Sequence, residues 1–340
     1  MSRVSVPFRS KLERGQALVL VAIAIVVLLG MASLAIDYGC VTAWKDELRR
    51  AADAAALAGA ARMGSGEEIA TATSFAAKNS AAGKSVTLGS GDAVLGAYDF
   101  TSGLFSPSAP PANQNAIHVT ARRTASAPDG ALPVFFASVL GITSAEVTVE
   151  SLAAVDRRLS GIAGGEGNLV PFLVNATTLG GIDGGGFHPA IGAQVDFYPE
   201  RDGAPGNFGL ADLDGGPNGV PELVEWITNG YPDPVTIPNP PGYLMVEGSP
   251  GFKAGVESAV ETRIGDTVAV LVYDQVTGEG ANSQFRVRTF CAVGISAVRM
   301  TGPMSSRYIR GNIQSITSSA AITSSGGMNN DSIALLRLVQ

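Results

Sequence analysis

The chain has 340 residues, enough for two modest domains beside a membrane anchor, with a net charge of −7 and only 16% charged residues. An acidic chain without a cluster of lysine and arginine lacks the basic surface that nucleic-acid binding requires, so we exclude nucleic acid as a partner. Glycine is abundant, with 42 residues, and nearly all of the 19 prolines lie beyond the first predicted helix. This composition favours loop-rich domains that contain β-strands.

An uninterrupted apolar segment runs from Ala17 to Ile36 without a charged residue or a proline. At a rise of 1.5 Å per residue, about twenty helical residues cover the ~30 Å hydrocarbon core of a bilayer. We therefore expect a single-pass transmembrane helix with its limits at Ala17 and Ile36. The preceding segment, residues 1–14, is basic, which predicts a cytoplasmic N-terminus and export of the remaining chain.

A cleaved secretory signal peptide is the alternative interpretation of this segment. The first residues are basic, and Ser33-Leu34-Ala35 offers small residues at a cleavage position. However, the apolar run is longer than most signal-peptide cores, and it continues into helix-forming sequence without a turn. We therefore favour a retained anchor.

The residues after the anchor, Asp37 to Arg62, contain no proline and are rich in alanine, the strongest helix former. The sequence thus predicts one helix over residues 15–62, half in the membrane and half a stalk. Ala51, Ala55 and Gly59 recur at every fourth position, a spacing that lets another helix approach closely. We expect this stripe to pack on the chain's own exported domain, with helix–helix self-association as the alternative.

Three short segments of this region resemble a known family: Arg14-Gly15-Gln16, Ala35-Ile36-Asp37-Tyr38-Gly39 and Ala51-Ala52-Asp53-Ala54-Ala55-Ala56-Leu57-Ala58-Gly59-Ala60. They are similar to the N-terminal Tad region of the bacterial TadE/TadG-like Flp-pilus assembly proteins. The resemblance implies anchoring in the bacterial inner membrane and an exported C-terminal region that is periplasmic or extracellular. It also implies contacts with pilus or secretion-machinery proteins.

One position distinguishes this chain from the pilin-like members of the family. Members that prepilin peptidase processes carry a glutamate five residues after the cleaved glycine, and counting from Gly15 that position is Leu20. The resemblance therefore implies a permanently anchored, TadG-like protein rather than a processed filament subunit.

Beyond the stalk, the sequence predicts two exported domains of different character. Residues 63–159 combine a helical pattern with short alternating segments, which predicts a small α+β domain. Residues 160–168 are rich in glycine and are interpreted as a linker. Residues 169–340 are dominated by strand patterns, which predicts a β-rich domain. The expected fold class is therefore α+β, with the long N-terminal helix in front.

Two short helices are predicted from their flanking residues. Pro133 as a start and Gly141 as a stop favour a short apolar helix that ends at Leu140. Ser249-Pro250 favours the start of a second helix over Gly251–Arg263.

The sequence contains no motif for catalysis. Its two histidines lack metal-ligand spacing, and neither a nucleophile elbow nor a phosphate-binding loop occurs. We therefore expect a non-enzymatic structural protein without a cofactor. The two cysteines, Cys40 and Cys291, are too few for a disulfide framework, and we expect two unrelated thiols with a single bridge as the alternative.

One loop carries the candidate metal-ligating residues. Asp212, Asp214 and Asn218 resemble part of a calcium loop, but the bidentate glutamate of an EF-hand would fall on Leu223, with Glu222 one residue short. A plain turn is the leading interpretation. The alternative function is an exported surface-binding module, tethered by the N-terminal helix, in which calcium at this loop supports adhesion.

Overall fold

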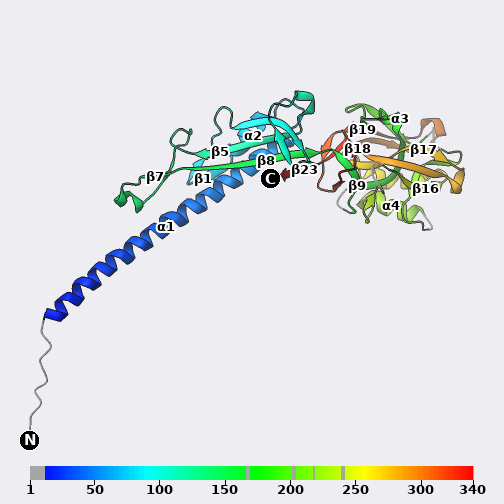
Figure 1. The fold of residues 1–340 in the computed structure, drawn as a ribbon. Coiled ribbons are helices and arrows are strands. Elements are labelled where there is room, and N and C mark those ends of the chain that lie inside the picture. The colour runs from blue at the N-terminus through cyan, green and yellow to red at the C-terminus, as the bar shows by residue number, and fades with distance from the viewer. Residues whose placement is uncertain (1–11, 166–168, 201–203, 217–218, 239–241, 340) are drawn as a thin grey trace, which may run out of the picture. The chain divides into compact units, whose positions relative to one another are not determined.

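The computed structural model describes residues 12–165, 169–200, 204–216, 219–238 and 242–339. The chain divides into two compact units, residues 1–95 with 117–152 and residues 96–116 with 153–340. It crosses between them inside three strands, β3 (Ala93–Asp99), β5 (Ala116–Arg123) and β8 (Val147–Asp156). The predicted α+β class with a long N-terminal helix is confirmed (Figure 1).

The first unit is organised by one helix, α1 (Leu12–Ala60), which joins the apolar run to the alanine-rich stalk without a break. Helix α2 (Glu68–Ala77) follows after a short turn. The Glu68 carboxylate holds that turn by accepting hydrogen bonds from the N–H groups of Gly64 and Gly66, at 2.7 and 3.1 Å. The remaining short elements are β1 (Ser80–Ala81), β2 (Lys84–Ser85), β6 (Leu132–Pro133), the 3-10 helix η2 (Ala137–Leu140) and β7 (Ser144–Ala145).

Small side chains form the core of the first unit. The buried face of α1 consists mainly of alanine, and it meets buried alanines of α2 and the apolar face of β5. Because alanine adds little bulk, the elements approach closely, and a methyl group on Gly59 would come within 2.8 Å of Ile117 and 3.1 Å of Ala72. The buried residues of this core are Leu48, Ala51, Ala52, Ala55, Ala56, Ala60, Ala72, Ala76, Ile117, Val119 and Ala121.

The second unit is built on a seven-stranded sheet in the order β13-β19-β18-β16-β14-β10-β17. Strand β17 (Thr267–Thr277) also pairs antiparallel with β18 (Gln284–Arg299), so β18, β16, β14, β10 and β17 close into a ring. Closure removes the free edges of these strands. The other strands of the sheet are β10 (Leu169–Asn175), β13 (Gln194–Tyr198), β14 (Asn207–Asp212), β16 (Leu244–Pro250) and β19 (Tyr308–Gln314).

The strands at the centre of this ring have uninterrupted apolar sequences. Residues 169–174 and 268–273 are buried at every position, as expected for strands that are covered on both faces. Aromatic side chains fill the interior, with the rings of Phe172 and Phe197 centred 5.5 Å apart and those of Tyr273 and Phe285 4.9 Å apart. Such tilted and edge-to-face contacts stabilise a core beyond simple burial.

The second unit contains further, smaller elements. Helix α4 (Val220–Asn229) buries Leu223, Trp226 and Ile227, which recur at the spacing of one helix face. Strand β9 (Arg158–Ile162) pairs with β15, β21 and β22. The other elements are β4 (Leu104–Ser106), η1 (Pro111–Asn113), α3 (Ala176–Leu179), β11 (Ile182–Asp183), β12 (Gly186–Phe187), β15 (Val235–Thr236), η3 (Ala254–Val256), α5 (Glu257–Glu261), η4 (Gly280–Asn282), η5 (Met304–Ser306), β20 (Ile316–Thr317), β21 (Ala321–Thr323), β22 (Met328–Asn329) and β23 (Ile333–Val339).

The predicted linker, residues 160–168, differs from the structure in its first part. Residues 160–162 belong to β9 and are buried. Gly161 serves close packing there, because a Cβ atom would lie 2.7 Å from the carbonyl oxygen of Val235. Residues 166–168 lie outside the described part of the chain.

The predicted helix over Gly251–Arg263 is also shorter than expected. Strand β16 extends through Pro250, and Gly251 has a φ of +78°, which is incompatible with a right-handed helix. Helical structure therefore begins only with η3 and continues into α5, which ends at Glu261.

Candidate functional site

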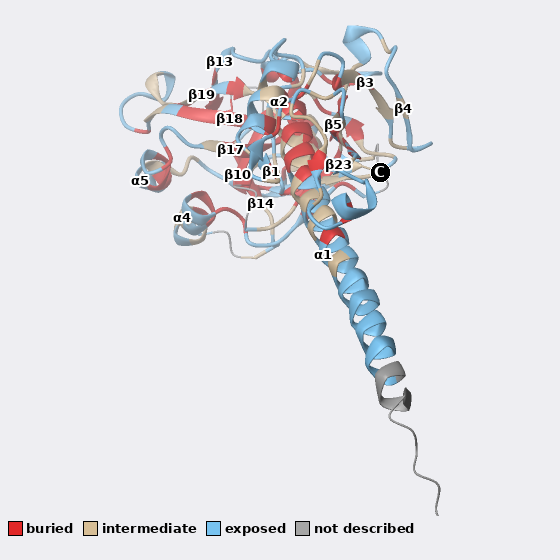
Figure 2. Cartoon of the chain, turned by 90° about the vertical axis from the view of Figure 1, so that its left-hand side faces the viewer, coloured by how far each residue is buried: buried red, intermediate tan, exposed pale blue. Residues whose placement is uncertain are grey.

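The two halves of α1 have opposite surroundings. From Ala17 to Ile36 its large side chains are exposed, whereas from Leu48 to Ala60 one face of the helix is buried in the rest of the first unit (Figure 2). Among the described residues, α1 is the one helix long and apolar enough to cross a membrane. An apolar surface of this extent is unfavourable in water and matches the length of a bilayer core. The exposed half of α1 is therefore the membrane anchor.

The small-residue stripe of the stalk is occupied within the chain. Ala51 and Ala55 are fully buried, and Gly59 has no room for a side chain beside Ile117 and Ala72. The expectation that the stripe packs on the chain's own exported domain agrees with this arrangement. Self-association through these residues would require the first unit to open.

Asp37 is the first buried side chain of α1 after Ala17, and it binds a distant loop. Its carboxylate accepts hydrogen bonds from the backbone N–H groups of Phe135, Phe136 and Ala137, at 2.9, 2.9 and 2.6 Å. These N–H groups lie at the start of η2, where no helical carbonyl is available to accept them. Charge-assisted hydrogen bonds of this kind are stronger than neutral ones. Asp37 thus fixes the loop at the end of the anchor.

This contact explains why the predicted helix from Pro133 to Leu140 is shorter. Pro133 ends strand β6, and only Ala137–Leu140 form a 3-10 turn. Gly141 stops that turn in the left-handed conformation with a φ of +84°, as predicted.

Two further contacts join α1 to the unit around it. The Trp44 and Phe135 rings are centred 6.1 Å apart, on the same face of α1 as Asp37. Farther along the stalk, the Glu47 carboxylate accepts a hydrogen bond from the N–H of Ala82 at 2.9 Å. The helix is therefore held to the rest of the first unit by side chains close to its apolar half as well as by its buried alanine face.

The predicted calcium loop follows β14. The carboxylates of Asp212 and Asp214 accept hydrogen bonds from the N–H groups of Gly215 and Gly216, both at 2.8 Å, which is the pattern of a plain turn. Asn218 lies outside the described residues. The described residues contain no group of three or more His, Cys, Asp or Glu side chains arranged to hold a metal ion.

Glu222, in the first turn of α4, comes near these two aspartates. Desolvation and the negative charges of Asp214 and Asp212 raise the pKa of Glu222 above its usual range. Desolvation and the neighbouring Asp214 likewise raise the pKa of Asp212. The Oε2 atom of Glu222 is buried with no hydrogen-bond partner among the described residues. Sequence spacing alone had placed Glu222 one residue out of register for an EF-hand.

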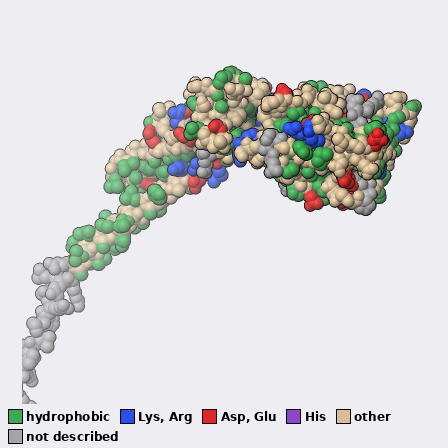
Figure 3. All heavy atoms as spheres, turned by 45° about the vertical axis from the view of Figure 1, so that its right-hand side comes forward, with side chains coloured by type: hydrophobic (Ala, Val, Ile, Leu, Met, Phe, Trp, Pro, Cys, Tyr) green, Lys and Arg blue, Asp and Glu red, His purple; other side chains and the backbone are tan. Residues whose placement is uncertain are grey.

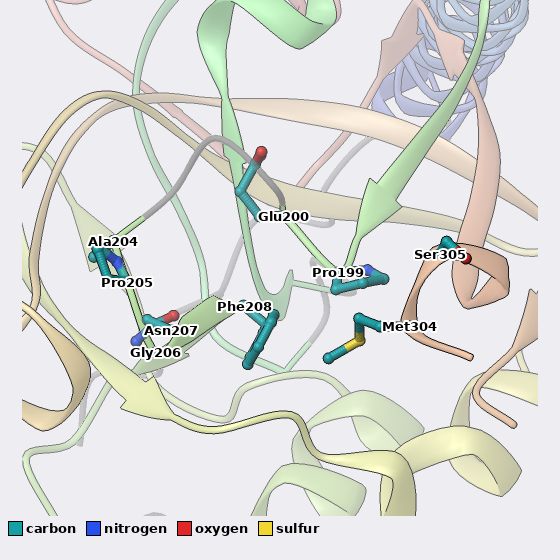
Figure 4. A pocket seen from close by; sticks show the side chains of 9 residues that line it. All are labelled: Pro199, Glu200, Ala204, Pro205, Gly206, Asn207, Phe208, Met304 and Ser305. Atoms are coloured by element: carbon teal, nitrogen blue, oxygen red, sulfur yellow. The ribbon is translucent and has the colours of Figure 1, made fainter. Parts of the chain in front are cut away.

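Two shallow cavities lie in the second unit. One of about 410 Å³ opens beside Asp212 and is lined also by Tyr231, Met245 and Glu247. The other, of about 440 Å³, has Pro199 and Met304 on one side and Asn207 on the other (Figure 4). Glu200 is its one charged described lining residue, and that carboxylate accepts the N–H of Asn175 at 3.0 Å. The described residues that line the two cavities include no histidine, lysine or cysteine.

The two histidines lie on separate elements. His188 follows β12, and its Nδ1 lies 2.6 Å from an oxygen of Asp331, which raises the pKa of His188. His118 lies on β5, with Nε2 3.5 Å from a carboxylate oxygen of Glu150. The two cysteines are free thiols: Cys291 is buried and Cys40 is partly exposed.

The role of Asp37 was missed by sequence reasoning. The sequence feature that could have indicated this role is the position of Asp37: it is a lone acid directly after the apolar run, on the helix face that also carries Trp44. The partner loop lies about a hundred positions farther along the chain, and no local pattern could identify it.

Two family models match the chain. Residues 15–62 match a model described as Flp pilus-assembly TadE/G-like, and residues 58–153 match one described as Tad-like Flp pilus-assembly. Comparison with curated proteins and with solved structures gave no match. The two models together cover α1 from Gly15 onward and the rest of the first unit. Residues 15–153 of this chain are therefore similar to the TadE/TadG-like Flp pilus-assembly proteins.

Proposed function

We propose that the protein is a non-enzymatic structural component of Flp pilus assembly or of its secretion apparatus. In this role α1 holds the protein in the inner membrane, with the N-terminus in the cytoplasm. The two exported units make protein–protein contacts on the other side. The family supplies the pilus-assembly setting.

The observation that carries the proposal is the continuity of α1. The same helix is an exposed apolar anchor up to Ile36 and the buried centre of the first unit from Leu48 onward. Asp37 and Glu47 fasten loops of that unit to the helix between these two parts. A rigid connection of this kind suits a tether that holds an exported domain at a defined place above the membrane.

The chemistry of the described residues supports a structural role. The described linings of the two cavities in the second unit contain acids but no histidine, lysine or cysteine, and the acids near the stalk bind backbone N–H groups. Enzymes instead hold acids, bases and nucleophiles within hydrogen-bond reach of one another.

The orientation rests on the charges at the two ends of the anchor. Four basic residues precede the apolar run against one acid, whereas basic and acidic residues are mixed after it. This asymmetry favours retention of the first segment in the cytoplasm. Fusion of alkaline phosphatase after the second unit should give an active, exported reporter, and an inactive reporter would contradict the orientation.

The functional test is deletion with complementation. Loss of the protein should abolish Flp pili, and the full chain should restore them while a variant lacking residues 17–36 should not. Co-purification of the full chain with pilus or secretion-machinery proteins should accompany restoration. Normal piliation in the deletion strain would contradict the proposal.

A second candidate function is calcium-dependent surface binding by the second unit. The observation in its favour is that Glu222 lies near Asp212 and Asp214, with one Glu222 oxygen buried and unpaired among the described residues; as described, the three side chains are not arranged to hold a metal ion. Desolvation by burial and, after it, repulsion from neighbouring acids raise the pKa values of Asp212 and Glu222, and a divalent cation would relieve the repulsion.

A further inference from the structure

A cluster of exposed apolar side chains lies on the loop that Asp37 binds. We call it the 135–142 patch: it comprises Phe135, Phe136, Val139, Leu140 and Ile142, and Val139 is 88% exposed. No charged residue occurs from Gly130 to Ala145. Other large apolar side chains that are exposed outside α1 lie singly or in pairs in the described chain, which is normal for a protein surface. Five exposed apolar side chains within eight residues are unfavourable in water, so this patch requires an apolar environment.

The hydrogen bonds of Asp37 place the 135–142 patch at a defined height along α1. Asp37 directly follows Ile36, the last residue of the apolar run, and it holds the N–H groups of Phe135, Phe136 and Ala137. Because the apolar run already spans ~30 Å of helix, its end coincides with the boundary of the hydrocarbon core. The patch is therefore held beside that boundary.

The side chains around this contact have the character of a membrane interface. Tyr38 is exposed, Trp44 is partly exposed, and Phe135 and Phe136 extend from the loop beside them. Aromatic residues are enriched where the hydrocarbon core meets the lipid headgroups. The first charged residue after Asp37 is Lys45, so this stretch of α1 is almost free of charge.

The exposed apolar surface of α1 continues onto the part of the protein that adjoins the helix. In Figure 3 the hydrophobic side chains of the helix form a band that continues onto the adjoining part of the protein. In Figure 1 the loop that precedes β7 lies beside α1, and the hydrogen bonds of Asp37 hold it there. A surface that adjoins a membrane-spanning helix and is held at its boundary is in reach of the same bilayer.

We propose that the 135–142 patch inserts into the interface of the membrane that α1 spans, as a second, monotopic contact. Val139, Leu140 and Ile142 enter the boundary between headgroups and acyl chains, while Asp37 satisfies the backbone N–H groups of the loop. That satisfaction matters because unpaired N–H groups are costly near the hydrocarbon core. The first unit then rests on the membrane surface at two points, which limits its tilt about α1.

The test measures the depth of a label at Val139 in the full chain, reconstituted in nanodiscs of phosphatidylcholine and phosphatidylglycerol. Val139→Cys is introduced together with Cys40→Ser, since buried Cys291 does not react, and is labelled with an environment-sensitive fluorophore. Lipids brominated at different acyl positions then act as quenchers. Val26→Cys is the control inside the anchor, because Val26 is exposed on the apolar half of α1. Ile69→Cys on α2 is the exposed control, since α2 packs at the far end of the stalk.

The proposal predicts that the Val139 label is shifted to the blue and quenched by lipids brominated near the headgroup. The Val26 label should be quenched by lipids brominated deeper, and the Ile69 label by none. A Val139 label that behaves like the Ile69 label while Val26 is quenched would overturn the proposal. A Val139 label that is shielded from water but not quenched by any lipid would also overturn it, because a protein would then cover the patch. Absence of quenching at both Val139 and Val26 would overturn the insertion and the anchor together.

Discussion

The carboxylate of Asp37 accepts a hydrogen bond from the N–H of Ala137 at 2.6 Å, although the two residues are 100 positions apart. Together with the N–H groups of Phe135 and Phe136, this contact joins the end of the membrane anchor to a loop that lies far along the chain. This contact connects the apolar half of α1 to the remainder of the first unit. Several properties of the protein depend on it.

Replacement of Asp37 should loosen this joint. Asp37→Asn keeps the size of the side chain but presents an amide group to three N–H donors, so at least one donor loses its partner. We expect the melting temperature of the detergent-solubilised protein to fall by several degrees. Asp46→Asn is the matched control, because Asp46 is an exposed acid on the same helix. Equal melting temperatures for the two variants would argue against the joint.

Enlarging Gly59 should destabilise the contact between α1 and its neighbours. Gly59→Leu forces atoms into the space taken by Ile117 and Ala72, and overpacking of this kind costs ~1–3 kcal/mol of unfolding free energy. Gly39→Leu on the same helix is the control, since no atom lies within 4 Å of a methyl group placed there. Denaturant unfolding of both variants measures the difference. A Gly59→Leu variant as stable as Gly39→Leu would contradict the packing of the stalk.

The pH dependence of His188 follows from its contact with Asp331. The hydrogen bond that the imidazole of His188 donates to the carboxylate of Asp331 raises the pKa of His188, so the folded protein holds this proton more tightly than the unfolded chain does. The resulting stabilisation is fully present below the unfolded pKa, about 6.5, and is lost as the pH rises through the folded pKa. His188→Gln should therefore lower the stability at about pH 5.5 and have a smaller effect in alkaline solution.

Nuclear magnetic resonance can measure the same pKa directly. In the His118→Gln variant His188 is the single histidine, because the sequence contains two. Its imidazole signal should titrate above the pH at which free histidine does. Titration at or below that pH would exclude the contact with Asp331.

The two cysteines should differ in reactivity. Burial raises the pKa of the Cys291 thiol to about 12, although a hydrogen bond with Ser332 opposes the shift. Because the thiolate is the reactive form, Cys291 should resist a thiol reagent until the protein unfolds. In a Cys40→Ser variant, the native protein should bind no reagent and the denatured protein one equivalent. Labelling of the native variant would show that the strand around Cys291 opens.

Calorimetry decides the second candidate function. If the Asp212 loop binds calcium, titration of the full chain should give a dissociation constant of ~10⁻⁴–10⁻³ M, the range of extracellular calcium modules. Binding should weaken at acid pH, since the raised pKa values of Asp212 and Glu222 favour their protonated forms there. The double variant Asp212→Asn, Asp214→Asn should abolish the heat, and Asp233→Asn should not. If calcium gives no heat of binding with the wild-type protein, the loop is a plain turn and the second candidate function is excluded.

Local sequence patterns were sufficient to predict the elements whose structure depends mainly on their own residues. The apolar run and the alanine-rich stalk led directly to α1, because length and helix propensity determine such a helix without help from distant residues. The strand patterns predicted within residues 169–340 include the apolar run at 268–273, which forms part of the buried strand β17. Gly141 ended its turn as expected, in the left-handed conformation that glycine adopts at no cost.

Features that depend on distant partners were not predictable in this way. Gly161 looked like part of a flexible linker, yet it is packed against Val235 of another strand. The closed ring of the second unit requires β17 to pair on both edges, which no local pattern indicates. Asp37 looked like a simple boundary residue, and its role appears only when the loop at 135–137 is placed beside it.

The central claim is that α1 is a permanent tether. The most direct measurement is peptide mass spectrometry of the protein that remains in the membrane pellet after alkaline carbonate extraction. The account predicts that the protein stays in the pellet and that its N-terminal peptides include residues on both sides of Gly15, consistent with Leu20 at the position of the prepilin glutamate. A soluble product that begins after Ala35, or a filament-bound product that begins after Gly15, would contradict it.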